Sequence, residues 1–169
     1  DYDSVFRYPL ATMVQFAVIT NIFYCSDMIG PLPAPLVPAL FAFLSLRSRI
    51  YSILPAKRPP RGGFEGKATP QDIKRPSWTP PGIAFPFIWF SIAGLRAASA
   101  FVVWRASGRT LCQPALLALV AHLCVGDTWN CITNVERRLG VSALGVFAVL
   151  GSVYNAIYTF GKVDPLAGW

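Results

Sequence analysis

Long runs of residues without a charge constrain this chain more than any other feature of its sequence. Five of these runs cover residues 8–26, 28–46, 82–95, 110–126 and 139–161. Several approach the roughly 20 apolar residues that a helix needs to cross about 30 Å of hydrocarbon. The mean hydropathy is +0.47 and only 14% of the residues are charged, which is too apolar for a soluble domain of this size. We therefore predict an all-α, polytopic transmembrane helix bundle of about five helices.

Proline, glycine and charged residues mark where the expected helices begin and end. They place helices at about 9–29, 39–54, 82–105, 114–135 and 141–160. The second of these either crosses the membrane or lies partly in its interface, and the sequence leaves both possibilities open. The predicted organisation is an N-terminal transmembrane helix in residues 1–29, followed by a helical bundle in residues 30–169 with a basic loop at 55–81.

The basic residues lie beside the apolar runs rather than on one face. The formal net charge is +7, but no continuous basic surface is available to follow a phosphate backbone, so nucleic acid is not an expected partner. With five crossings, eleven Lys and Arg residues fall on one side of the membrane and three on the other. By the positive-inside rule, the first side, which includes the loop at 55–81, faces the cytoplasm, stroma or matrix.

The chain starts at Asp1 rather than Met, which is compatible with a removed targeting peptide or with further residues ahead of it. We expect an organellar location, either a plastid thylakoid or a mitochondrial membrane. The four cysteines lie in or near apolar runs without metal-binding spacing, so we expect buried thiols rather than disulfides.

Two consecutive prolines, Pro80 and Pro81, precede the third apolar run and give it a stiff, extended start. We expect this segment to place Trp78 at a membrane surface. The helix that follows carries Trp89 and Trp104, fifteen residues apart, or about 22 Å along a helix. Tryptophan favours membrane interfaces because its ring is apolar and its N–H binds water. We therefore expect Trp104 at the far interface.

The order of these residues matches a known pattern. Residues 76–81 read Pro-Ser-Trp-Thr-Pro-Pro, and the apolar run that follows carries Trp89 and ends in Val103 and Trp104. The pattern continues with Trp129, Ile132, Arg137, Gly140, Gly151, Val163, Pro165, Leu166 and Ala167. Over residues 36–169 the chain resembles the TspO / translocator-protein family, the tryptophan-rich sensory proteins of five transmembrane helices.

The chain departs from that family in three places. The third family helix carries two tryptophans and then two phenylalanines, where this chain has Asp127, Trp129, Thr133 and Asn134. The fifth family helix, with its sterol-contact motif, is absent before Trp169. An extra apolar helix instead precedes residue 30, and we hypothesise that this helix, at 10–29, occupies the place of the missing one.

The resemblance implies a pocket for a tetrapyrrole or a sterol-like amphiphile, lined by aromatic rings. Trp78, Trp89 and Trp129 stand at the matching positions, and we expect either Arg96 or the basic residues of the loop at 55–81 to pair with a propionate. The expected ligands are chlorophyll or another tetrapyrrole, a carotenoid or a lipid. The alternative that these tryptophans only anchor the interface and fill the core stays open.

His122 is the only histidine and lies in mid-span. Its imidazole is either an axial ligand to haem iron or chlorophyll magnesium, or a hydrogen-bonding partner of a neighbouring helix. Asp127 also lies in this span and needs a partner there. Arg96 is the obvious one, but the two residues lie at different depths if their helices are antiparallel. We therefore expect a partner chain, or the opposite membrane interface, to supply the interaction partner of Asp127.

The sequence contains no nucleophile–base pair, paired carboxylates, phosphate-binding loop or metal cluster, so we expect no enzyme activity. Two functions remain. The first is an accessory or structural subunit that packs against other subunits of a large photosynthetic or respiratory membrane complex and binds pigment or lipid. The second is a free-standing sensor or transporter of tetrapyrroles or sterol-like molecules. The altered third helix, the extra helix and the unpaired Asp127 favour the subunit, whereas the intact Trp-x-Pro-Pro segment favours the free-standing protein.

Overall fold

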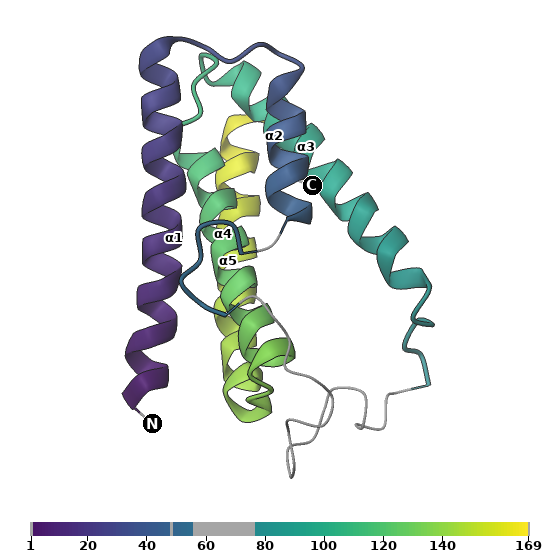
Figure 1. Cartoon of the computed structure of the whole chain (residues 1–169). Coiled ribbons are helices and arrows are strands. Elements are labelled where there is room, and N and C mark those ends of the chain that lie inside the picture. The colour runs from purple at the N-terminus through teal and green to yellow at the C-terminus, as the bar shows by residue number, and fades with distance from the viewer. Residues whose placement is uncertain (1, 48, 56–76, 169) are drawn as a thin grey trace.

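The computed structural model describes residues 2–47, 49–55 and 77–168. This part of the chain is mainly helical (Figure 1). The helices are α1 (Tyr2–Ile29), α2 (Leu36–Leu46), α3 (Ala84–Ala106), α4 (Pro114–Asn130) and α5 (Leu139–Val163), and a short π-helix, η1 (Cys131–Val135), continues α4. The predicted all-α bundle of about five helices is confirmed. Most of the basic loop predicted at 55–81 lies outside the described residues.

Four stretches of the described chain are long and apolar enough to cross a membrane: Ser4–Ile29, Ala84–Ala106, Pro114–Val135 and Leu139–Val163. In contrast, α2 has 11 residues, or about 16 Å, and is too short to cross the hydrocarbon by itself. The helix predicted at 39–54 is confirmed over 39–46, whereas its predicted end at 54 and a full crossing of the membrane are wrong. The helix ends at Leu46 because Arg47 has extended backbone, with φ of −94° and ψ of 90°. Arg49 and Tyr51 then have left-handed backbone with φ of 64° and 61°, so the helix does not resume.

The first helix begins earlier than its proline signal predicted. α1 starts at Tyr2 and contains Pro9, the residue at which we expected the helix to begin. A proline inside a helix removes one N–H bond and crowds the preceding turn, but membrane helices tolerate this because neighbouring groups satisfy the freed carbonyl. Proline is therefore a weaker mark of a helix start in this chain than it is in a soluble protein.

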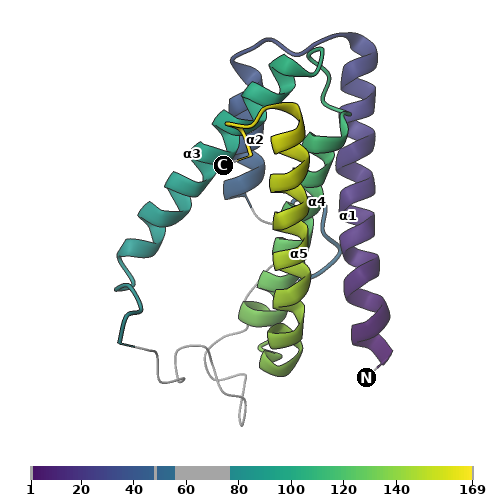
Figure 2. The same cartoon turned by 180° about the vertical axis from the view of Figure 1, so that it is seen from behind.

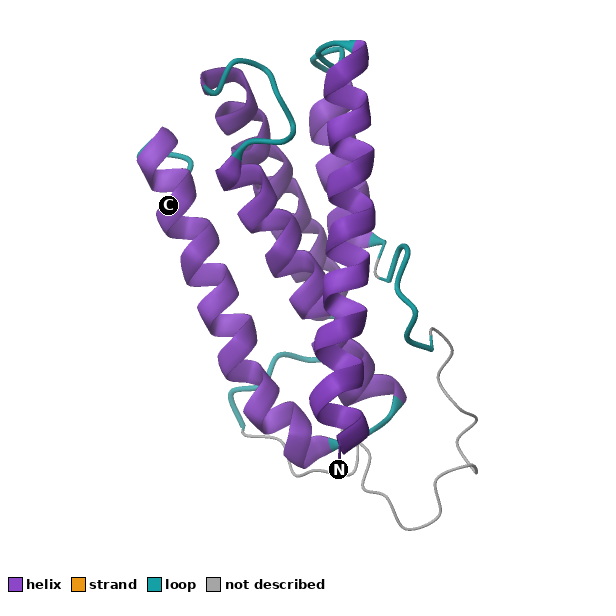
Figure 3. Cartoon of the chain, turned by 90° about the vertical axis from the view of Figure 1, so that its left-hand side faces the viewer, coloured by secondary structure: helices purple, strands orange, loops and turns teal. Residues whose placement is uncertain are grey.

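α4 has α1 on one side and α5 on the other (Figures 1 and 2), whereas α2 packs mainly against α3. α1 has a buried stripe made of Tyr8, Ala11, Gln15, Ile19 and Phe23. These residues recur every three or four positions, which is the spacing of one helix face. At the end of the stripe, Phe23 meets Phe41 of α2 edge to face, with ring centroids 5.9 Å apart. Seen from the side, the long helices stand alongside one another (Figure 3).

α3 joins the bundle only through its C-terminal two-thirds. Its buried residues are Ala93, Ala97, Ala100, Val103 and Trp104. Nearer the N-terminus of the helix, Phe87 and Phe90 are 71% and 64% exposed. There α3 leans away from α4 and α5 (Figures 1 and 2). The N-terminal third of α3 therefore presents aromatic side chains that the described residues do not cover.

Trp104 is buried inside the protein. It is 2% exposed, and its ring stacks on Phe101 with centroids 5.9 Å apart. Its indole N–H has no hydrogen-bond partner among the described residues. Trp104 is therefore a core residue, because it lies where α3 packs into the bundle. It stands two residues before the end of the span at Ala106, and its location at the far membrane interface stays a prediction.

Candidate functional site

Arg96, His122 and Ser152 connect α3, α4 and α5 through a series of hydrogen bonds. Arg96 Nη2 lies 2.9 Å from His122 Nε2, and His122 Nδ1 lies 3.0 Å from Ser152 Oγ. A guanidinium only donates, so Nε2 accepts and Nδ1 carries the proton. Ser152 Oγ then accepts from Nδ1–H and donates to the carbonyl of Val149 at 2.8 Å. Arg96 thus contacts His122 and not Asp127. This confirms the prediction that Arg96 and Asp127 lie at different depths in the membrane.

Arg96 has no carboxylate partner in the part of the chain that the structure describes. The ion pair found there joins Arg7 and Glu136, on other elements. His122, which accepts the hydrogen bond from Arg96, is neutral in this arrangement. A cation within a membrane span is stabilised by an opposite charge or by water. Arg96 is therefore suited to hold an anionic group.

Two tryptophans extend this site toward the side on which α3 leaves the bundle. Trp89 lies seven residues before Arg96 on α3, and Trp129 lies seven residues after His122 on α4. Seven residues are close to two helical turns, so each tryptophan shares a helix face with its polar partner, about 10 Å away along the axis. Because α3 and α4 run antiparallel (Figure 1), the two indoles lie at similar depths. Trp89 is 56% exposed.

Trp129 is held between α4 and α5. Its Nε1–H donates to the carbonyl of Ser142 at 2.9 Å, and its ring lies against the backbone at Gly145, where a Cβ would come within 3.2 Å of Cδ1. Trp78, ahead of α3, is 81% exposed. The described residues do not bring Trp78, Trp89 and Trp129 around an enclosed cavity, so an aromatic pocket stays a prediction.

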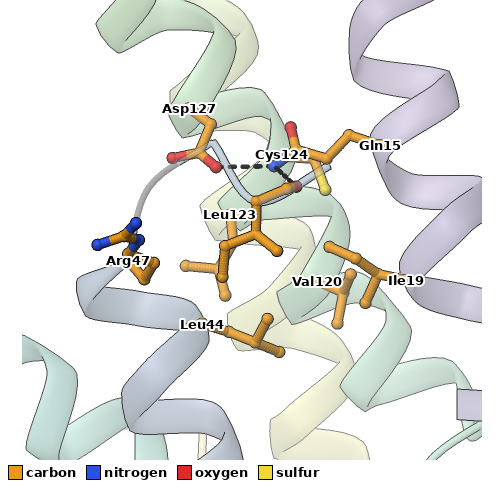
Figure 4. A pocket seen from close by; sticks show the side chains of 9 residues that line it. Gln15, Ile19, Leu44, Arg47, Val120, Leu123, Cys124 and Asp127 are labelled. Carbon is orange, nitrogen blue, oxygen red and sulfur yellow. Dashed lines mark hydrogen bonds between the residues drawn. The ribbon is translucent and has the colours of Figure 1, made fainter. Parts of the chain in front are cut away.

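Asp127 finds its partners inside the chain. Its Oδ2 accepts a hydrogen bond from Gln15 Nε2 at 2.8 Å (Figure 4). The same oxygen accepts a second one from the backbone N–H of Arg49 at 2.6 Å. Gln15 Nε2 also donates to the carbonyl of Ile50 at 3.0 Å. The expectation that a partner chain or the opposite interface satisfies Asp127 is wrong, because α1 and the segment after α2 both reach it.

These hydrogen bonds explain how the chain continues beyond the end of α2 as irregular backbone inside the bundle. Gln15 lies near the middle of α1, so the backbone that it binds lies at a similar depth. Residues 49–55 are not helical, and irregular backbone within a membrane must find its hydrogen-bond partners in the protein. Gln15 supplies a donor for the Ile50 carbonyl, and Asp127 supplies an acceptor for the Arg49 N–H.

A small cavity lies beside Gln15 and Asp127. Its volume is about 10 Å³, room for about one water molecule. Leu44, Arg47 and Cys124 also line it (Figure 4). This cavity is too small for a tetrapyrrole or a lipid chain. Gln15 and Asp127 therefore form a structural centre rather than a ligand site.

Further contacts join α1 to the rest of the bundle along its length. In the middle of α1, Thr12 Oγ1 and Thr128 Oγ1 lie 2.7 Å apart. At one end, Glu136 accepts hydrogen bonds from Arg7 and Tyr8. At the other end, Asp27 accepts from the backbone N–H groups of Leu111 and Cys112 at 2.8–3.0 Å. The extra N-terminal helix is thus an integral part of the bundle.

The TspO/MBR family model matches residues 61–169, which is more than half of the chain. This chain belongs to the TspO/MBR family. No curated protein and no solved structure matches it. The match contains α3, α4 and α5, so Arg96, His122 and Ser152 all come from the TspO/MBR part of the chain.

The hydrogen bonds of Asp127 join the TspO/MBR part to the segments that precede it in the chain. Asp127 lies within the match, whereas Gln15 and Arg49 lie outside it. α1 packs against α4 of the TspO/MBR part, but its replacement of a fifth family helix remains a hypothesis.

The TspO/MBR part does not present His122 as an open axial ligand. His122 is 6% exposed, and both of its ring nitrogens are hydrogen-bonded. An axial bond to haem iron or chlorophyll magnesium requires Nε2 to leave Arg96 or Nδ1 to leave Ser152. The described residues also contain no group of three or more His, Cys, Asp or Glu that could hold a metal ion. As packed here, His122 does not fit an axial site, and ligation by His122 stays a prediction.

Proposed function

We propose that this TspO/MBR protein is a non-enzymatic membrane protein that binds a flat amphiphile with an ionised carboxylate, such as a free-acid tetrapyrrole. The observation that carries the proposal is Arg96, a cation inside a membrane span that donates to the neutral His122. A propionate supplies the missing negative charge and two acceptor oxygens for the guanidinium. Tetrapyrrole binding is general in this family, which supports the choice of ligand.

The positions of the indoles support the same ligand. Trp89 and Trp129 lie about two helical turns from Arg96 and His122, on neighbouring helices and at similar depths. A ring system whose carboxylate binds Arg96 extends from there toward the side on which α3 leaves the bundle. Indole faces pack well against flat conjugated rings. Trp78, exposed ahead of α3, is the third aromatic group of the proposed site.

The charge of Arg96 also distinguishes between the candidate ligands that the sequence allowed. Sterols and carotenoids have no ionised carboxylate, and in chlorophyll the propionate is esterified. Arg96 therefore discriminates against all three. A fatty acid shares the carboxylate but has no ring for the indoles to contact. A tetrapyrrole with free propionates satisfies both parts of the site.

A pair of porphyrins tests the proposal. The purified protein in lipid nanodiscs is titrated with protoporphyrin IX and with its dimethyl ester, and binding is followed by quenching of tryptophan fluorescence. We expect the free acid to bind more tightly. Arg96→Met keeps a long side chain without the charge, and we expect it to weaken binding of the acid by about tenfold or more, the scale of a charged hydrogen bond. Binding of the ester is expected to stay the same.

Arg105→Met is the matched control. Arg105 lies on the same helix, over the ring of Phe101, and outside the proposed site. We expect this variant to bind both porphyrins as the wild type does. Equal affinity of the wild type for acid and ester, or an unchanged affinity of Arg96→Met for the acid, contradicts the proposal.

A second candidate function is an accessory subunit of a larger photosynthetic or respiratory complex, in a thylakoid or mitochondrial membrane with its basic loop toward the stroma or matrix. The exposed N-terminal third of α3 favours it, because a helix that leaves its own bundle offers several faces to a neighbouring subunit. The test is a native gel of the source membranes in mild detergent, with an absorption spectrum of the band. A large band with pigment absorption supports the subunit, and a colourless band at the mass of one or two chains contradicts it.

A further inference from the structure

α1 carries a polar side chain on a face that the bundle does not cover. Asn21 is exposed and lies outside the buried stripe that runs from Tyr8 to Phe23. It is eight residues from the end of the span at Ile29, or about 12 Å along the helix. In a hydrocarbon layer of about 30 Å, this position lies within the apolar part of the bilayer.

The amide of Asn21 is only partly satisfied by its own helix. Its Nδ2 donates to the carbonyl of Ala17 at 2.8 Å. The other N–H and the Oδ1 acceptor have no partner among the described residues. Lipid chains offer neither a donor nor an acceptor, so an amide at this depth favours contact with another helix.

The residues around Asn21 allow such a helix to approach closely. They line a shallow groove along α1 that includes Val14, Ala17, Val18 and Cys25. Ala17 and Cys25 lie one turn on either side of Asn21, and small side chains at this spacing let two membrane helices pack tightly. All residues of the groove belong to α1, so no other described element occupies it.

A second copy of the chain provides the complementary group. Two copies inserted with the same orientation are related by a two-fold axis along the membrane normal. Each residue near that axis then meets its own counterpart at the same depth. An asparagine amide both donates and accepts, so two Asn21 side chains satisfy each other. A different protein needs its own polar group at that depth.

We propose that α1 forms a parallel, two-fold interface with α1 of a second copy, centred on Asn21 and flanked by Ala17 and Cys25. This surface lies ahead of the residues that match the TspO/MBR family. It is also independent of the ligand site proposed at Arg96, since it uses neither that residue nor the indoles.

Cys25 makes the interface directly testable. The full chain in lipid vesicles is treated with copper phenanthroline, an oxidant that takes two electrons while two thiols lose their protons and their sulfurs join. We expect a disulfide-linked dimer that is absent in Cys25→Ser. Asn21→Leu is expected to weaken dimerisation roughly tenfold, the scale of one amide pair between membrane helices, and to lower the cross-linked fraction accordingly.

Asn155→Leu is the matched control, because Asn155 is also an exposed asparagine, but on α5. We expect it to cross-link as the wild type does. The mass of the wild type in nanodiscs or detergent gives a second measurement, expected to be that of two chains. If Asn21→Leu loses its helical circular dichroism, Ala17→Leu, which adds bulk on the same face, replaces it. Equal cross-linking of these variants and the wild type, a monomer at all concentrations, or another protein bound to α1 overturns the proposal.

Discussion

Gln15 Nε2 lies 2.8 Å from Asp127 Oδ2 and 3.0 Å from the carbonyl of Ile50, so one side chain of α1 holds both α4 and the segment after α2. Gln15 is 2% exposed. In an interior without water, these groups depend on one another for their hydrogen bonds. α1, which precedes the family match, therefore stabilises the inside of the bundle and not only its outer surface.

Loss of the Asp127 carboxylate is expected to destabilise the fold. In Asp127→Ala, the Arg49 N–H and one hydrogen bond of Gln15 lose their acceptor, and a buried donor without a partner costs about 1–3 kcal/mol. We expect the midpoint of thermal unfolding in detergent, followed by circular dichroism, to fall. Asp127→Asn keeps an acceptor oxygen and is expected to lie between Asp127→Ala and the wild type. An unchanged midpoint in Asp127→Ala shows that the contact does not contribute to stability.

A larger side chain at position 145 is expected to displace Trp129. The Cβ of Gly145→Val comes within 3.2 Å of the indole, whereas a Cβ at Gly151 meets nothing within 4 Å. Added bulk in a packed interface costs about 1–3 kcal/mol. We expect Gly145→Val to lower the unfolding midpoint and to shift the tryptophan emission spectrum. Gly151→Val makes the same change on the same helix and is expected to do neither, so similar behaviour of the two variants refutes the steric explanation.

The thiol of Cys112 is expected to react slowly with alkylating reagents. It lies between α3 and α4, outside the spans, where burial raises its pKa, and Asp27 and Cys25 raise the pKa further. A raised pKa lowers the fraction of thiolate, which is the reactive form. Asp27→Asn removes the carboxylate charge, so the pKa moves down toward its ordinary value and alkylation at pH 8 becomes faster.

The rate is measured with a maleimide by mass spectrometry of the peptide that contains Cys112. A Cys25→Ser background removes the exposed thiol, and the two other thiols, of Cys124 and Cys131, are buried. The rate is expected to rise with pH in both proteins and to be higher in Asp27→Asn at each pH. A rate that is equal or lower in Asp27→Asn contradicts the assigned electrostatic effect.

The C-terminal segment is expected to depend on a glycine at position 168. A Cβ there would lie 2.6 Å from the Cα of Gly161 on α5, whereas a Cβ at Gly161 would lie 3.9 Å from Gly168, which is an ordinary contact. Gly168→Ala therefore forces the segment away from α5. We expect faster proteolysis of the C-terminus in Gly168→Ala than in Gly161→Ala. Equal rates in these two variants mean that the close approach is unimportant.

Local signals in the sequence were enough to locate α3, α4 and α5. The start of α4 shows why: Pro114 occupies the first turn, and the side chain of Gln113 accepts a hydrogen bond from the N–H of Ala115 at 3.1 Å. Such signals act over a few residues, so they can be read without the fold. Helical spacing and antiparallel order also placed Arg96 and Asp127 at different depths. The sequence alone did not reveal Ser152 as the partner of His122, although a hydroxyl in an uncharged run is a signal for such a role.

The sequence by itself determined which stretches are helical, that they are suited to a membrane, and to which family the pattern belongs, because apolar length and local motifs are properties of neighbouring residues. Only the tertiary structure decided the end of α2, the burial of Trp104 and the partner of Asp127. Gln15 and Asp127 are 112 positions apart in the chain. Whether two such groups meet depends on the depth and facing direction of two packed helices, and no short-range pattern contains that information.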